Sequence, residues 1–201
     1  MIQKTLTAAI LLSAALLTAA LSAAEPDIVV ADFEAADYGD WKVTGEAFGK
    51  GPARGSIGSQ MKVTGFLGKG LVNSFLGKDP ATGTLTSPET AIQRDYINFL
   101  IGGGMHPKET CVNLLVDGEV VRTATGPNDL PGGSERLDWT HWDVEELKGK
   151  TAVLEIVDRH VGGDRLVRVR LQPVRLPRIV RQRDGALGDV DGGDVHCATE
   201  A

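Results

Sequence analysis

An extended run over residues 138–144 alternates aromatic and polar side chains that could hold a sugar. Successive side chains of a strand point to opposite faces, so Trp142 and Val144 share one face while Trp139 and His141 share the other. If the Val144 face packs on the core, Trp139 and His141 point outward. A flat aromatic ring beside polar groups can then contact the apolar side of a sugar ring. The alternative is that Trp139 buries its ring against a second layer, as Trp commonly does.

Two further polar side chains are candidate ligands. Arg136 lies shortly before the aromatic run, and His106 follows the glycine loop Gly102–Gly104. His106, His141 and His160 are too far apart in the sequence to make a metal-ligand motif, because no H-x-x-x-H or HExxH spacing occurs. For each of them, a hydrogen-bonded structural histidine is the alternative.

The 27 acidic residues raise the question of whether the chain could cut a glycan. A glycosidase needs two carboxylates across a cleft, one of them protonated near neutral pH. Sequence alone does not pair these groups in space, and no serine lies in a G-x-S-x-G nucleophile elbow. We therefore predict no catalytic residue, with an unrecognised carboxylate pair as the alternative.

No cofactor is predicted, although structural calcium is one option at the start of the body. Asp32 and Glu34 could contribute to such a site, because Ca²⁺ prefers oxygen ligands. The alternative is that both are turn or edge acids without an ion.

The composition is that of an acidic globular protein. The 201 residues carry a net charge of −6, with 42% hydrophobic and 24% charged residues. This balance argues against a nucleic-acid partner. Two cysteines are too few for a disulfide-stapled miniprotein or a thiolate zinc site, and 25 glycines indicate many tight turns.

Short β-type segments alternate with turn residues from Asp27 to Asp158, which predicts an all-β protein with an antiparallel β-sandwich. The architecture expected is jelly-roll-like, of the carbohydrate-binding-module type. Tyr96–Ile101 is nearly continuous apolar and should be a central strand buried on both faces. The other expected strands are Ile28–Phe33, Trp41–Phe48, Gln60–Phe66, Gly70–Phe75, Leu137–Val144 and Thr151–Val157.

The clearest local pattern is a hairpin. Cys111–Val116 and Glu119–Thr125 are both β-prone, and Asp117-Gly118 joins them in a two-residue turn that needs positive φ. Val144–Gly149 is expected to form one helical turn closed by glycine.

The first 24 residues are expected to be a secretory signal peptide. Lys4 precedes an uncharged Ala/Leu/Thr/Ser run over 6–21, and Ser22–Ala24 supplies small residues for cleavage. A membrane anchor is the alternative, but the run is shorter than the roughly 20 residues a spanning helix needs. The mature chain is therefore expected to be secreted or periplasmic, with no membrane partner after cleavage.

Residues 25–163 are expected to form the β-sandwich module, and 164–201 differ from it in composition. The tail contains no lysine and no aromatic residue, and eight arginines fall between Arg159 and Arg183 before a Gly/Asp-rich run. We interpret it as an altered or out-of-frame C-terminus; a basic arm for an anionic partner is the alternative. Leu166–Leu171 could replace a missing closing strand, whereas residues beyond about 172 are expected to be disordered.

Several segments of the body, in order, resemble one family. These are Ala31–Glu34, Asp37–Trp41, Gly68–Phe75, Gly83–Pro88, Asp95–Gly104, Arg122–Asn128 and Gly132–Leu137. They are similar to the N-terminal β-sandwich accessory domain of secreted levanase-like fructan hydrolases of glycoside hydrolase family 32. The resemblance covers roughly residues 27–163 and implies a carbohydrate partner, in particular a fructan, and in relatives a covalently attached hydrolase domain.

The chain departs from that family in two places. Asp164–Arg168 follows Gly162-Gly163, where relatives have a Gly-Gly-Trp-Gly-His-Ile-type strand. The family's Asn-Asp-Pro-Asn-Gly, Arg-Asp-Pro and Glu-Cys motifs have no counterpart, since Asn128–Pro131, Arg94–Tyr96 and Glu109–Cys111 do not fit them. The fructan-cleaving activity therefore does not carry over.

The sequence thus favours a secreted, non-catalytic module that holds a glycan through Trp139, His141, Arg136 and His106. The alternatives are a purely structural module or hydrolase remnant without a ligand, and an enzyme with an unrecognised carboxylate pair.

Overall fold

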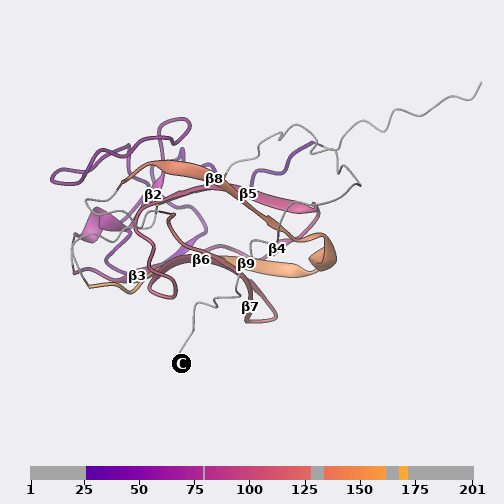
Figure 1. Cartoon of the computed structure of the whole chain (residues 1–201). Helices are drawn as coiled ribbons and strands as arrows, with labels where there is room; N and C mark the ends of the chain where they lie inside the picture. Colours follow the sequence, from indigo (N-terminus) through magenta and orange to yellow (C-terminus); the bar gives the residue numbers. More distant parts are fainter. Residues whose placement is uncertain (1–25, 79, 128–133, 162–167, 172–201) are drawn as a thin grey trace, which may run out of the picture.

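The computed structural model describes residues 26–78, 80–127, 134–161 and 168–171, and within them it is built of antiparallel strands in two layers (Figure 1). The expected all-β sandwich is confirmed. The expected signal peptide lies outside the described residues, as does the tail apart from 168–171. Within the described part of the chain, no helix is long and apolar enough to cross a membrane.

The lower layer in Figure 1 is a six-stranded sheet with the strand order β1-β3-β9-β6-β7, to which β4 adds by pairing with β9. Its strands are β1 (Lys42–Gly45), β3 (Gly83–Thr86), β4 (Thr90–Ala91), β6 (Thr110–Val116), β7 (Glu119–Ala124) and β9 (Thr151–Asp158). The β6–β7 hairpin is the one predicted, because Asp117 and Gly118 both have positive φ, at 54° and 82°.

The upper layer is a four-stranded sheet with the strand order β2-β10-β5-β8. Its strands are β2 (Val72–Asn73), β5 (Tyr96–Gly102), β8 (Leu137–Asp143) and β10 (Arg168–Leu171). β10 lies between β2 and β5 and is antiparallel to both. The backbone of residues 168–171 thus takes the place for which the sequence offered Leu166–Leu171.

The main core lies between the two layers. Phe99 of β5 and Trp142 of β8 face Val112 of β6 and Ile156 of β9, and all four are buried. A smaller cluster covers one end of the outer face of the four-stranded sheet, where Leu100, Leu137 and residues of the 51–71 segment pack together. Among the described residues, the outer face is therefore covered at one end, and its exposed remainder is the surface described below.

Two predicted strands do not form. Residues 28–33 lie outside any strand: Ile28–Val30 are exposed, and Phe33 has a left-handed φ of 55° that ends extended structure. Gln60–Phe66 takes part in one isolated bridge, from Thr64 to Arg136. Its backbone is held by a side chain instead, since the Ser56 hydroxyl accepts from the Val63 N–H at 2.8 Å.

Two other predicted strands are shorter than expected. The two short helical segments that the structure describes are 3-10 turns. The predicted strand Trp41–Phe48 is confined to β1, and Gly70–Phe75 to β2. β2 ends because the Asn73 side chain accepts from the Phe75 N–H and starts the turn η1 (Ser74–Gly77). The other turn, η2 (Glu145–Leu147), is the one predicted before Gly149, whose φ is 84°.

Candidate functional site

An aromatic and polar strip lies on the outer face of the four-stranded sheet. It consists of Tyr96 and Asn98 of β5 with Trp139 and His141 of β8, and we call it the outer strip. The antiparallel register places Asn98 opposite His141 and Leu100 opposite Trp139. Directly opposed residues project to the same face, so two adjacent strands build one surface.

Three side chains of the outer strip are exposed, and Asn98 is half-buried. Trp139 is 41% exposed, Tyr96 is 44% exposed, and His141 is also exposed. The Tyr96 and His141 rings meet edge to face, with centroids 5.8 Å apart and planes at 72°. The outer strip therefore presents an exposed tryptophan ring beside a tyrosine and a histidine ring that contact each other.

The opposite face of β8 explains why Trp139 points outward. Trp142 is buried, its ring lies 4.6 Å from Phe99, and its indole N–H donates to the Thr123 carbonyl at 3.3 Å. Val144 is also buried. The Trp142 side thus faces the core, and the alternation predicted from the sequence places Trp139 and His141 on the solvent side.

Asn98 has an enclosed hydrogen-bonding atom within the strip. Its side-chain carbonyl oxygen is buried and accepts no hydrogen bond among the described residues. A buried carbonyl oxygen without a donor costs about 1–3 kcal/mol, so it is a strong acceptor for a hydroxyl that reaches it. The sequence did not single out Tyr96 or Asn98. They lie beside Trp139 only because β5 pairs with β8, and these residues are more than 40 positions apart in the sequence.

Arg136 does not belong to the outer strip. Its guanidinium is ion-paired with Asp138 at 2.9 Å, and alternation puts both on the opposite side of the strand from Trp139. Both side chains are largely exposed, so this pair contributes little to stability. The structure thus brings together Trp139 and His141, and it leaves Arg136 out of that group.

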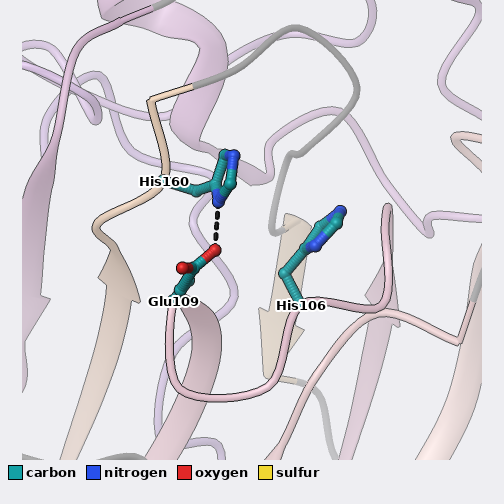
Figure 2. Close-up of side chains that lie close together, drawn as sticks. All are labelled: His106, Glu109 and His160. Carbon is teal, nitrogen blue, oxygen red and sulfur yellow. Dashed lines mark hydrogen bonds and ion pairs between the residues drawn. The ribbon is translucent and has the colours of Figure 1, made fainter.

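His106 is placed at a different sheet. It lies in the turn before β6, where it forms a bridge to Thr110, and Thr110 pairs with Asp158 of β9. Its ring stacks on His160 with centroids 5.1 Å apart (Figure 2). His106 is therefore part of a second cluster, at the end of the six-stranded sheet.

Asp32 and Glu34 both accept hydrogen bonds from the chain itself. The Asp32 carboxylate accepts from the Glu34 N–H at 3.0 Å. The Glu34 carboxylate accepts from the backbone of Lys69 and Gly70 at 2.9 and 3.2 Å, and Arg54 lies 3.8 Å from its other oxygen. The Glu34 contacts hold the turn at residues 68–70, and both acids have a structural role.

No protein-family model matches the chain. Over 123 residues it is 45% identical to a protein of Aspergillus rugulosus named "Putative glycosyl hydrolase ecdE". The match covers 61% of this chain and 17% of that protein, so this chain corresponds to a small part of its relative. Among solved structures, a family 35 carbohydrate binding module from an environmental isolate is 14% identical with a TM-score of 0.35, over 66% of this chain and 93% of that module.

Proposed function

We propose that this sandwich is a non-catalytic module that binds carbohydrate on the outer strip. The observation that carries the proposal is the exposed Trp139 ring beside the Tyr96–His141 pair on one continuous face of two strands. The similarity to part of a protein named as a glycosyl hydrolase supports it, because a module that holds a glycan keeps a linked enzyme close to its polymer.

The strip offers the two kinds of contact that a sugar needs. The Trp139 ring can stack on the apolar C–H face of a pyranose or furanose ring. The exposed His141 ring can bond a hydroxyl group at the edge of the same sugar. The enclosed Asn98 oxygen can accept from a second hydroxyl when the side chains around it move apart. An open face of this size gives weak binding, which becomes effective when a linked domain keeps the enzyme close to its polymer.

The ligand class we propose is a fructan-type glycan, and the compartment is outside the cytoplasm. The first rests on the resemblance to the accessory domain of levanase-like hydrolases. The second rests on the N-terminal run over residues 6–24 that is typical of a signal peptide.

The test is affinity electrophoresis of the protein in gels that contain levan or inulin. We expect retardation of the wild type, and a loss of about tenfold or more in apparent affinity for Trp139→Ala. The control is Glu119→Ala, an exposed residue of the β6–β7 hairpin in the other sheet, which should migrate as the wild type does. Equal retardation of Trp139→Ala and wild type, with both folded by circular dichroism, would place any glycan elsewhere.

A second candidate function is that of a structural module that packs on another domain, and the length of the relative favours it. Because the matched part is only 17% of that protein, the outer strip could instead pack on another domain of a longer chain. A packing surface predicts no retardation on any glycan gel. Release of reducing sugar by the purified protein would contradict both proposals and favour an enzyme.

A further inference from the structure

Three metal-ligating side chains meet at the end of the six-stranded sheet, away from the outer strip. They are His106, Glu109 and His160, and one ligand atom from each lies within 4.8 Å of the other two. Figure 2 shows His160 above Glu109, with the His106 ring beside them. The two histidines are partly buried and the carboxylate is exposed, so the cluster can be reached from solvent.

The backbone holds these residues in place. Thr110 of β6 pairs with Asp158 of β9, and this pairing brings the turn before β6 next to the chain after β9. The Arg159 N–H donates to the Glu109 carbonyl at 2.7 Å, and the Thr110 N–H donates to the His106 carbonyl at 2.9 Å. His106 and His160 are 54 residues apart in the sequence, yet the strand pairing sets their separation in space.

The hydrogen bonding of His160 fixes which nitrogen is available. Its Nδ1 bonds the Glu109 carboxylate, and that contact places the proton of a neutral ring on Nδ1. Nε2 is then left with a lone pair. This Nε2 is buried and has no hydrogen-bond partner among the described residues.

We propose that His106 and His160 bind a divalent transition-metal ion of the Zn²⁺ class, with Glu109 as the residue that positions His160. A carboxylate that accepts from one imidazole nitrogen, while the other nitrogen faces the metal, is the usual outer partner of a metal-bound histidine. The ion gives the orphaned Nε2 a partner, and Glu109 supplies negative charge next to it. Imidazole ligands suit Zn²⁺, Cu²⁺ and Ni²⁺, whereas Ca²⁺ and Mg²⁺ prefer oxygen.

Binding of an ion requires the side chains of the cluster to move closer together. Two ligand atoms on a tetrahedral Zn²⁺, each 2.0–2.1 Å from the ion, are about 3.3 Å apart. One ligand atom from each residue of the cluster lies within 4.8 Å of the others. Because His160 Nε2 is enclosed, the imidazole rings have to turn before both histidines can hold one ion. Solvent supplies the remaining ligands on the exposed side. This proposal is independent of carbohydrate binding.

The direct test is a titration of the full chain with ZnCl₂, followed through the side-chain nitrogen resonances of its histidines. We expect the His106 and His160 nitrogens to shift with saturation, and those of His141 to stay unchanged. CaCl₂ at the same concentration should shift none of them. This measurement needs no substitution, so it does not depend on how a variant folds.

Calorimetry on variants then assigns the roles. His106→Gln and His160→Gln should each bind Zn²⁺ at least tenfold more weakly than the wild type, and Glu109→Gln about 10–100-fold more weakly. His141→Gln and His196→Gln, which remove the other two histidines of the chain, should bind as the wild type does. The proposal is overturned if the His106 and His160 resonances do not respond to Zn²⁺, or if binding is lost with His196→Gln instead.

Discussion

The phenol ring of Tyr96 on β5 meets the imidazole of His141 on β8 edge to face, with their centroids 5.8 Å apart. This contact joins two strands across the outer face and limits the rotation of both rings. A surface whose aromatic rings are already ordered loses less side-chain entropy when a ligand stacks on it. Tyr96 is therefore expected to contribute to binding through its ring.

Replacing Tyr96 tests that contribution. We expect Tyr96→Ala to weaken glycan binding about twofold to tenfold, in line with the 0.5–1.5 kcal/mol of an aromatic contact. Tyr96→Phe keeps the ring and should bind as the wild type does. Calorimetry with inulin oligosaccharides measures both, and a Tyr96→Phe variant as weak as Tyr96→Ala would assign the effect to the hydroxyl.

Asn98 should show opposite effects on stability and on binding. Asn98→Leu removes a buried carbonyl oxygen that has no donor within the described part of the chain. We expect the free energy of unfolding to rise by about 1 kcal/mol, because the desolvation cost disappears. The same variant should bind the glycan more weakly. Urea unfolding and affinity electrophoresis measure the two effects, and a destabilised variant would argue that the oxygen is satisfied in solution.

Trp142 should matter for stability, in contrast to Trp139 on the other side of the strand. Trp142→Ala removes a buried ring that packs on Phe99 and donates to the Thr123 carbonyl. We expect a loss of about 3–5 kcal/mol in the free energy of unfolding, the range for a buried aromatic residue. Trp139→Ala should change it by less than about 1 kcal/mol. If urea unfolding gave equal losses, both tryptophans would be core residues.

Because Tyr38 is buried, we expect the protein to lose stability at alkaline pH. Burial raises the pKa of its phenol, and the hydroxyl donates to the Phe48 carbonyl at 3.0 Å. In the unfolded chain the group ionises near pH 10, while in the folded chain it stays neutral to higher pH. The contribution of Tyr38 to the free energy of unfolding is complete below pH 10. Above pH 10 the free energy of unfolding falls by up to about 1.4 kcal/mol per pH unit, because the unfolded chain releases the phenol proton and the folded chain keeps it.

Comparison with Tyr38→Phe isolates this effect from the other groups that titrate in the same range. The variant should be less stable at pH 7 by about 1 kcal/mol, because the hydrogen bond is lost. The difference between the two proteins should shrink and then reverse as the pH rises above 10. A difference that stays constant from pH 8 to 11 would mean that Tyr38 titrates normally.

Local sequence patterns predicted the parts of the fold that depend on neighbours in the chain. Asp117-Gly118 defines the β6–β7 hairpin because both residues accept positive φ. Ile28–Val30 misled the prediction, because β-branched residues favour a strand only when a partner strand is available. That segment pairs with no strand in the part of the chain that the structure describes, and the left-handed Phe33 that follows turns the chain away.

The candidate site was predictable only within one strand. Period-two alternation predicted the outward direction of Trp139 and His141 correctly, since it needs no knowledge of the fold. Tyr96 and Asn98 belong to a strand that was expected to be buried on both faces. The segment 51–71 covers Leu100 on the outer face of this strand, whereas Tyr96 is exposed and Asn98 is half-buried. His160 was judged too distant from His106 for a joint site, because the pairing of β6 with β9 that joins them is not encoded locally.

The position of β10 has a consequence for biosynthesis. It lies between β2 and β5, although it is made about 70 residues after β5 and almost 100 after β2. A nascent chain on the ribosome cannot close this layer until residue 171 has emerged, so the facing edges of β2 and β5 stay unpaired while the residues between them and β10 are made. Chaperones that bind extended segments would have their longest opportunity at these two edges.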